Sequence, residues 1–196
     1  SNFMVIHTQG SHFRYNQRYP SQYEIFKPSF DNSMDFTSIT SENAEYLMNA
    51  YDNSILYTDF FLSSLINDLN ARCPIWSMIY LSDHGENIFD DERNIVLHGS
   101  LIVTEYEVHI PFIVAYSDGY KEKYPEKVEH IIANKNKNIT SEVIFHSLLN
   151  MADIQTDIIS DTLCIDQNTL KNLSSTYILN GNRMPTLFDF TRLEKE

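Results

Sequence analysis

Hydrophobic positions along the chain form short apolar runs that alternate with stretches of helical spacing. Residues 3–6 and 110–116 are two such runs, and residues 75–81 form an almost continuous one without polar alternation. A run of this kind is typical of a central strand buried on both faces. Between residues 40 and 69 the apolar side chains recur every three or four positions, which predicts a long amphipathic helix capped by Thr40. The alternation predicts an α/β fold with a mostly parallel sheet flanked by helices.

The remaining segments predict shorter elements and connections. Residues 21–39 are polar and aromatic without a clear period, so we expect a long ordered loop, and the Asn/Lys tract at 134–138 predicts a solvated connection. Residues 141–151 have helical spacing after a capping Thr140, and residues 176–179 predict an edge strand. The inner face of the long helix is expected to carry Leu47, Tyr51, Ile55, Thr58, Leu62, Leu65 and Leu69.

Composition favours one folded domain or part of one. The chain has 196 residues, of which 42% are hydrophobic, and this is enough to bury a sizeable core. No run approaches the roughly 20 apolar residues that a membrane helix needs. Because residues 3–6 already predict a core strand, we expect the chain to be a piece of a larger domain. Cys73 and Cys164 match no metal-ligand spacing, and the sequence leaves open whether they form a disulfide or remain two buried thiols.

The charge balance bears on the class of partner. Fourteen basic and 27 acidic side chains give a net charge of −13. This charge repels the phosphate backbone, so we expect no nucleic-acid partner. A small phosphorylated substrate is still compatible, because a bound metal ion reverses the local field.

The sequence Ser-Asp-His-Gly-Glu follows the apolar run 75–81 directly, at residues 82–86. Ligands of open α/β sheets bind beyond the carboxyl ends of strands, so the motif lies where a site is expected. Asp83 and His84 can share one metal ion only if the chain has already left the strand, and Gly85 eases that turn. A carboxylate and an imidazole are half of a tetrahedral zinc site. Taken alone, the motif fits equally well a turn with an Asp–His hydrogen bond.

Two further histidine motifs have a similar context. His7 and His12 flank Gly10 directly after the run 3–6, and His98 lies in Leu-His-Gly after an acidic loop. Four of the seven histidines therefore follow strand ends or a loop facing them, which favours a metal or phosphate site over coincidence. The other three histidines have no such context, and we interpret them as structural or exposed: His109, His130 and His146.

These motifs together resemble those of bacterial phosphoethanolamine transferases in the alkaline-phosphatase/sulfatase superfamily. Residues 7–20 read HTQGSHFRYNQRYP, residues 51–59 read YDNSILYTD, and the metal motif SDHGE is followed by LHG and then IPFIV. The motifs occur in the family's order, and the helical stretch SEVIFHSLLNMADI lies in its expected place. The resemblance covers most of the chain up to residue 154 and implies a sulfatase-like α/β domain.

The resemblance implies a role for each matching residue. Asp83 and His84 match two zinc ligands, whereas His12 and His98 match histidines that contact the transferred phosphate or a second zinc ion. Glu86 matches an acidic residue near the phosphoethanolamine pocket, and His7 a histidine that lines the same site. The family's threonine nucleophile and its remaining glutamate ligand are expected upstream, so no catalytic nucleophile is expected in this chain.

The implied activity is zinc-dependent transfer of phosphoethanolamine from phosphatidylethanolamine to lipid A or a lipopolysaccharide core sugar. The chain would then be the C-terminal part of a periplasmic catalytic domain, and an N-terminal region absent here would anchor the protein in the bacterial inner membrane. The same superfamily also contains sulfatases, phosphatases and glycerol-phosphate transferases, which stay open as alternatives. A second hypothesis is a folded, non-catalytic module, because half of the first metal shell is missing.

Overall fold

The computed structural model describes residues 2–30 and 33–195. Its described residues divide into two compact units. The first unit lies within Ser1–Asp68 and Glu86–Leu97, and the second within Leu69–Gly85 and His98–Glu196. Each unit is described by itself.

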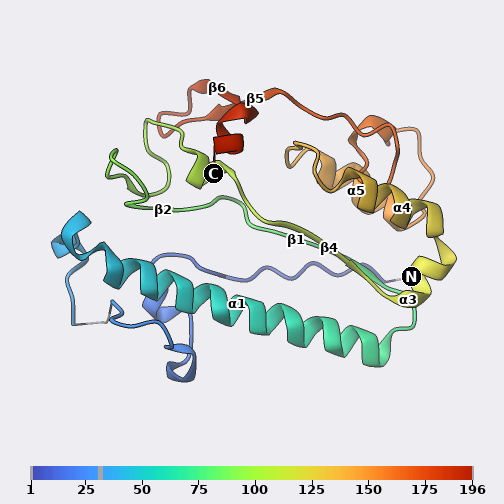
Figure 1. Ribbon diagram of the computed structural model, residues 1–196. Helices are drawn as coiled ribbons and strands as arrows, with labels where there is room; N and C mark the ends of the chain where they lie inside the picture. Colours follow the sequence, from blue (N-terminus) through green and yellow to red (C-terminus); the bar gives the residue numbers. More distant parts are fainter. Residues whose placement is uncertain (1, 31–32, 196) are drawn as a thin grey trace. The chain divides into compact units, whose positions relative to one another are not determined.

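A long helix, α1 (Ala44–Arg72), is the main element of the first unit (Figure 1). A 3₁₀ turn, Ser41–Asn43, leads into it, and the Asn43 side chain accepts the Thr40 N–H at 2.7 Å. This bond satisfies a donor at the start of the helix, so the predicted start is confirmed. The buried positions of α1 are Leu47, Ala50, Asn53 and Ser54. Ile55 was expected on the inner face but is 44% exposed, because the buried face of α1 is formed by Asn53 and Ser54 at this point of the helix.

The core of the first unit lies between α1 and the irregular segments around it. Its buried members are Tyr15, Phe30, Leu47, Ala50 and Ile88. The expected loop over residues 21–39 is irregular and contains the short 3₁₀ turns Ser21–Tyr23 and Phe36–Ser38, while residues 31–32 of it lie outside the described part. A two-stranded hairpin, β2 (Asn87–Ile88) with β3 (Val96–Leu97), contributes Ile88 to this core.

The predicted strand at residues 3–6 is wrong. These residues form no strand, and their apolar side chains are exposed, with Phe3 at 73%. A strand requires a neighbour that completes its hydrogen bonds, and none of the described strands pairs with this segment. An apolar run therefore indicates burial only where a partner is available.

In the second unit, β1 (Ser77–Leu81) pairs with β4 (Phe112–Tyr116) in antiparallel register. Leu81 lies opposite Phe112, so the end of β1 is beside the start of β4. The sequence predicted both strands, with Pro111 just before β4, but it predicted mostly parallel pairing and a central position for β1. Among the described residues, all strand pairs are antiparallel and β1 has one neighbour. The apolar pattern of each run predicts burial, but it does not encode the direction in which the neighbouring strand runs.

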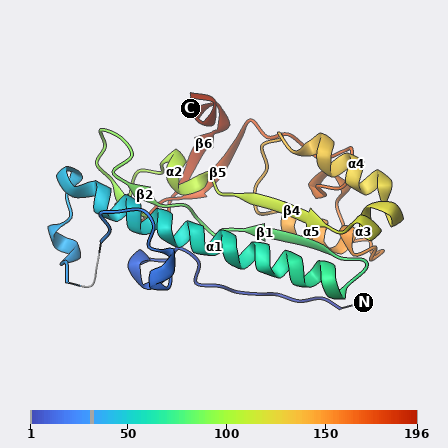
Figure 2. The ribbon, with the colours of Figure 1, turned by 60° about the horizontal axis from the view of Figure 1, so that its bottom comes forward.

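Three helices follow β4: α3 (Asp118–Lys123), α4 (Pro125–Asn134) and α5 (Val143–Met151) (Figure 2). Apolar side chains of α4 and α5 pack on the β1–β4 pair around Val143, Met151, Ile165 and Leu170. The sequence predicted α5 but missed α3 and α4. The N-cap of α5 is Glu142 rather than the predicted Thr140. The connection before α5 was predicted to begin at Asn134, but Asn134 is buried and is the last residue of α4, so the connection begins one residue later.

A C-terminal hairpin joins β5 (Ser175–Leu179) to β6 (Pro185–Asp189). The edge strand predicted at 176–179 is confirmed, and β6 was not predicted. Phe188 and Phe190 bury against Val103, which precedes the short helix α2 (Glu105–Val108).

Both cysteines are free thiols, which decides the alternative that the sequence left open. Cys164 is buried, and burial raises the pKa of its thiol to about 12, so it stays protonated at neutral pH. Within the described chain, no helix combines the length and apolar character that crossing a bilayer requires.

The buried side chain of Asn53 fixes the loop of the first unit on α1, and its removal should destabilise the fold. Its Oδ1 accepts the N–H groups of Ile25 at 2.8 Å and Phe26 at 2.9 Å, and its Nδ2 donates to the Phe26 carbonyl at 3.0 Å. Asn53→Ala removes three bonds from buried groups, so we expect the free energy of unfolding to fall by about 3 kcal/mol, at about 1 kcal/mol for each bond. Urea denaturation measures this loss.

Asn49→Ala is the matched control, since Asn49 lies one turn earlier on α1. Its side chain is half-buried and donates one bond, to the Pro28 carbonyl at 2.7 Å. We expect a loss of about 1 kcal/mol or less. Equal losses in the two variants would contradict the role assigned to Asn53.

Asp166 in the second unit should make stability depend on pH. Its side chain is fully buried, and burial raises its pKa above the ordinary value, against the attraction of Lys127 and His130. The folded chain therefore retains this proton to higher pH than the unfolded chain, and stability falls as the pH rises above about 3.9, the unfolded value. Asp166→Asn should flatten this fall in urea denaturation across a pH series. Asp157→Asn, at an exposed position, is the control. If both variants give the same dependence of stability on pH, the assignment to Asp166 is refuted.

Candidate metal centre

The chain leaves β1 before it reaches Asp83, as the sequence predicted. β1 ends at Leu81, and the Ser82 hydroxyl donates to the His84 carbonyl at 2.6 Å. The Asp83 carboxylate accepts the His84 N–H at 3.2 Å. These local bonds turn the backbone, so adjacent side chains no longer point to opposite faces.

The ring of His84 is oriented by its own loop. Nδ1 lies 2.8 Å from the Gly85 carbonyl oxygen. Because a carbonyl can only accept, this contact makes Nδ1 the donor and leaves the lone pair on Nε2. Nε2 lies 3.9 Å from Oδ2 of Asp83, whose side chain is 90% exposed. The two predicted ligands thus present an imidazole nitrogen and a carboxylate oxygen on the same side of the turn.

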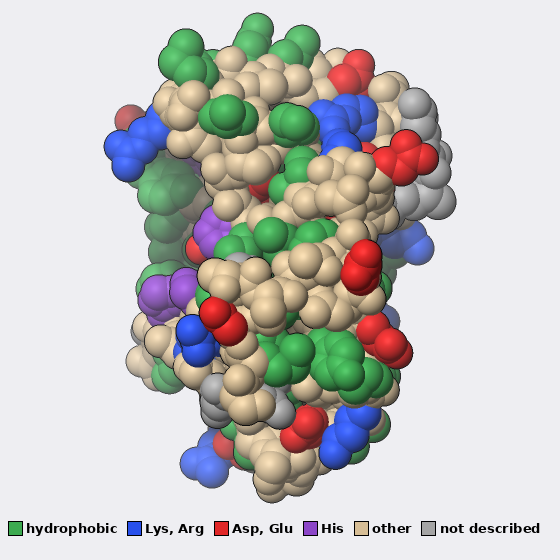
Figure 3. Space-filling view, turned by 90° about the vertical axis from the view of Figure 1, so that its left-hand side faces the viewer, with side chains coloured by type: hydrophobic (Ala, Val, Ile, Leu, Met, Phe, Trp, Pro, Cys, Tyr) green, Lys and Arg blue, Asp and Glu red, His purple; other side chains and the backbone are tan. Residues whose placement is uncertain are grey.

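His98 lies against His84. Their ring centroids are 3.7 Å apart and the rings are tilted by 33°. His98 is exposed, and histidine side chains reach the surface on the face drawn in Figure 3. The second unit therefore brings together two histidines that are 14 residues apart in the sequence. Their roles as metal or phosphate ligands stay predictions.

Glycine is required where the metal motif meets the segment before β4. The Gly85 N–H donates to the Glu107 carbonyl at 2.7 Å, and a Cβ on Gly85 would lie 2.1 Å from the Tyr106 carbonyl oxygen. No side chain fits at that distance without moving the backbone. Gly85 thus permits close contact between the two segments, in addition to the turn expected from the sequence.

Glu86 belongs to the first unit, where it is largely buried. Burial raises the pKa of Tyr15 well above its usual range, and the Glu86 carboxylate raises it further. Tyr15 therefore stays protonated, and its ring packs edge-on against Tyr51 with centroids 5.1 Å apart. The predicted role of Glu86 beside a substrate stays a prediction.

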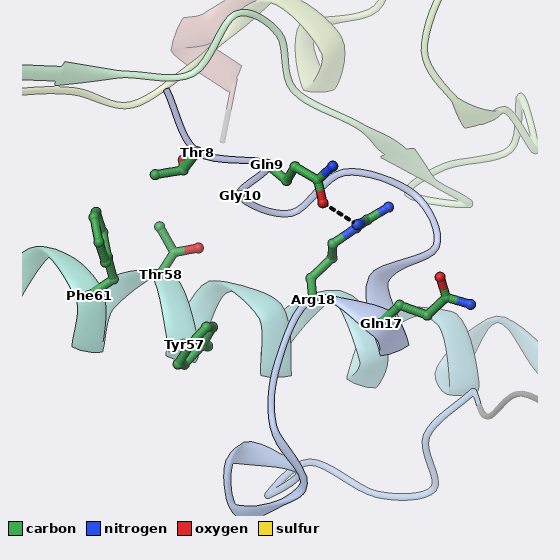
Figure 4. Close-up of a pocket in the computed structure, with 8 residues that line it drawn as sticks. All are labelled: Thr8, Gln9, Gly10, Gln17, Arg18, Tyr57, Thr58 and Phe61. Atoms are coloured by element: carbon green, nitrogen blue, oxygen red, sulfur yellow. Dashed lines mark hydrogen bonds between the residues drawn. The ribbon is translucent and has the colours of Figure 1, made fainter. Parts of the chain in front are cut away.

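His7 and His12 are exposed in the first unit. Arg18 shapes their loop, because its Nε donates to the His12 carbonyl at 2.7 Å and its Nη2 to the Phe13 carbonyl at 3.0 Å. Beside this loop is a pocket of about 240 Å³, lined in part by Gln9, whose side chain Arg18 also contacts (Figure 4). Neither histidine lines the pocket. The convergence of His12 with Asp83 and His98, which belong to the other unit, stays a prediction.

The three histidines without a motif have structural or exposed positions. His109 is exposed, His130 has Nδ1 3.2 Å from the Asp166 carbonyl, and Nδ1 of His146 accepts the Ser160 N–H at 3.2 Å. Sequence reasoning missed Glu107, because its contacts with residues 85 and 99 join segments far apart in the sequence, and an acidic residue between two motifs carries no signal of such contacts.

Comparisons with known proteins find related sequences. The sulfatase family matches residues 1–154. The chain is 39% identical over 152 residues to the phosphoethanolamine transferase EptA of Helicobacter pylori, an alignment that covers 76% of this chain and 27% of the relative.

Solved structures give the same relationship. The C-terminal periplasmic domain of the phosphoethanolamine transferase EptC from Campylobacter jejuni superposes with a TM-score of 0.69 at 32% identity, over 84% of this chain and 51% of that domain. The corresponding domain of EptC from Escherichia coli, in complex with zinc, is alike in fold, with a TM-score of 0.65 at 23% identity over 93% and 49% of the two chains. The chain thus spans about half of these domains and about a quarter of the Helicobacter protein.

The match covers the site as well as the scaffold. It contains β1, the loop that carries Asp83 and His84, and the segment that carries His98. The sulfatase-like α/β class expected from the sequence is therefore confirmed, with antiparallel pairing of the described strands as the local correction. The chain belongs to the sulfatase family.

Proposed function

We propose that the chain is part of a zinc-dependent transferase that moves phosphoethanolamine from phosphatidylethanolamine to lipid A or to a lipopolysaccharide core sugar. The contact between His84 and His98 carries this proposal, because it joins two histidine motifs inside a match to enzymes named for phosphoethanolamine transfer. The relatives' names favour transfer over hydrolysis of a sulfate or phosphate ester, which uses similar parts.

The donor set suits zinc. Two ligand atoms that bind one zinc ion at about 2.0–2.2 Å each lie within about 4.4 Å of one another. Nε2 of His84 and Oδ2 of Asp83 are 3.9 Å apart, and the contact of Nδ1 with Gly85 directs Nε2 outward. When bound, zinc activates a hydroxyl nucleophile and polarises the phosphoryl group.

The chain's own residues then bind and orient the substrate. His98, and His12 from the other motif, hold the non-bridging oxygens of the phosphoryl group or donate a proton to it. Glu86 and His7 lie near the phosphoethanolamine, whose ammonium group a carboxylate attracts. The threonine that becomes covalently modified belongs to an upstream segment of a longer protein, so this chain contributes the C-terminal part of the catalytic domain.

The proposed location follows from the same relatives. The structures of EptC are of periplasmic domains, and the proposed donor and acceptor are membrane lipids. We place the chain in the periplasm of a bacterium, attached to the inner membrane through an N-terminal region outside this sequence.

Zinc binding tests the assignment of the ligands. Asp83 and His84 supply two ligands where a closed site needs four, so we expect weak binding of Zn²⁺ by the chain in calorimetry at neutral pH. Asp83→Ala and His84→Ala should remove measurable binding, because each leaves a single assigned ligand. His98→Ala should reduce binding without abolishing it.

His109→Ala is the matched control, since His109 is another exposed histidine of the second unit. Its zinc affinity should equal that of the parent chain. Tight stoichiometric binding that survives Asp83→Ala would show that zinc is held elsewhere.

Activity of the longer protein tests the proposed reaction. Replacing Asp83 or His84 with alanine should reduce transfer by more than about 100-fold. Removing a group that only orients a metal ligand already costs about 10–100-fold in activity, and removing the ligand itself costs more. His98→Ala and His12→Ala should slow turnover by about 10²-fold or more while zinc stays bound. The measurement is diacylglycerol release from labelled phosphatidylethanolamine.

The chain alone should give no turnover even with added zinc, because the nucleophile belongs to the upstream segment. In the longer protein, His146→Ala should keep nearly full activity, since His146 contacts only the Ser160 backbone in the described hydrogen bonds. Zinc-dependent turnover by the 196 residues alone would place a nucleophile within them and overturn this assignment.

A further inference from the structure

We propose that Glu107 is a positioning residue that joins the two histidine loops of the second unit and so sets the spacing of the His84 and His98 rings. The proposal rests on the proposed function, because it concerns the same site. Glu107 is the third residue of α2 and reaches both loops at once. Glu107 accepts one hydrogen bond from each loop: its main-chain carbonyl accepts from the first loop and its carboxylate from the second.

The two contacts are made to equivalent positions. The Glu107 carbonyl accepts the N–H of Gly85 at 2.7 Å, and Oε1 of its carboxylate accepts the N–H of Gly99 at 2.8 Å. Each glycine directly follows one of the paired histidines. A shift of either loop therefore moves an imidazole ring by a similar distance.

Glu107 itself is held firmly. Its N–H donates to the buried Thr104 hydroxyl at 3.2 Å, which fixes the start of α2. The preceding Glu105 forms an ion pair with Arg192 at 2.7 Å, which ties α2 to the segment after β6. Because Thr104 holds the start of α2 and Arg192 holds Glu105, the helix is fixed in place. The carboxylate of Glu107 can therefore define where the Gly99 loop lies.

One oxygen of the Glu107 carboxylate is withdrawn from water, and the other makes the exposed contact with Gly99. Oε2 of Glu107 is buried and accepts no hydrogen bond from the described residues. A hydrogen bond from an N–H to an ionised carboxylate is roughly twice as strong as a neutral one, so the contact with Gly99 offsets part of the desolvation. A half-buried acidic side chain that accepts the amide N–H of one loop indicates that the position of that loop is constrained.

Both glycines make the contacts possible. Gly85 lets the first loop approach the backbone of α2, and Gly99 has a φ of +74°, which favours glycine over residues with a Cβ. The turn between β5 and β6 supports the second loop from another direction, since the Gly181 N–H donates to the Ser100 carbonyl at 2.8 Å. The His98 loop is thus held between Glu107 and the C-terminal hairpin.

The test compares Glu107→Ala with Glu107→Gln in the 196-residue chain, and Glu122→Ala, at an exposed glutamate of α3 in the second unit, is the control. Three quantities are measured: amide hydrogen exchange at Gly99 and Gly85, the chemical shifts of the His98 ring protons, and the dissociation constant for Zn²⁺. The Gly85 amide is an internal control, because its acceptor is a main-chain carbonyl that every variant retains.

We expect Glu107→Ala to lose protection at Gly99 but not at Gly85, to move the His98 ring shifts, and to weaken Zn²⁺ binding by about 10–100-fold. Glu107→Gln retains an oxygen acceptor and should restore most of each property. Glu122→Ala should leave all three near their parent values. A role in stability alone would not move the ring shifts selectively or be rescued by glutamine.

Unchanged Gly99 exchange and unchanged His98 shifts in Glu107→Ala would overturn the proposal. If Glu107→Ala also exposes Gly85, α2 has unfolded, and Glu107→Asp then decides by the same measurements, since it keeps the charge but withdraws the carboxylate by one methylene. If the parent chain binds no Zn²⁺, the metal part of the proposed function fails, while Gly99 exchange and the ring shifts still decide the role of Glu107.

Discussion

The antiparallel register of β1 and β4 determines where the chemistry of the second unit is assembled. Leu81 at the end of β1 lies opposite Phe112 at the start of β4, so the chain that leaves one strand meets the chain that enters the other. The loop with Asp83 and His84 therefore lies against the backbone of residues 106–107, as the contact of Gly85 with Tyr106 shows. Shifting the register by one residue would turn the strand side chains to the opposite face and separate these segments.

This constraint explains why small residues occur at the junctions. A Cβ on Gly85 would come within 2.1 Å of one carbonyl oxygen, and a Cβ on Gly181 within 2.0 Å of the Gly99 carbonyl oxygen. At both points, two backbones meet without a side chain between them. The side chains that bear the chemistry, by contrast, point outward from the loops. Such a backbone junction fixes the two loops from which the His84 and His98 rings project.

The sequence predicted the local features well, because local spacing determines them. The cap at Thr40, the strand before Asp83 and the turn at Gly85 all follow from neighbouring residues. The strand predicted at residues 3–6 failed because pairing depends on a partner elsewhere, and the direction of the β1–β4 pair failed for the same reason. The contact between His84 and His98 could be expected as a cluster, but its geometry depends on long-range hydrogen bonds that no spacing encodes.

Net charge adds a last constraint on the site. With 27 acidic and 14 basic side chains, the field of the chain opposes the approach of any phosphorylated molecule. The residues beside His84 and His98 strengthen this, because Asp83 and Glu107 both carry carboxylates there. Imidazoles alone do not reverse that potential, whereas a divalent cation bound beside Asp83 would reverse it. The acidic character that repels a polyanion thus fits the proposed metal centre and its proposed phosphorylated substrate.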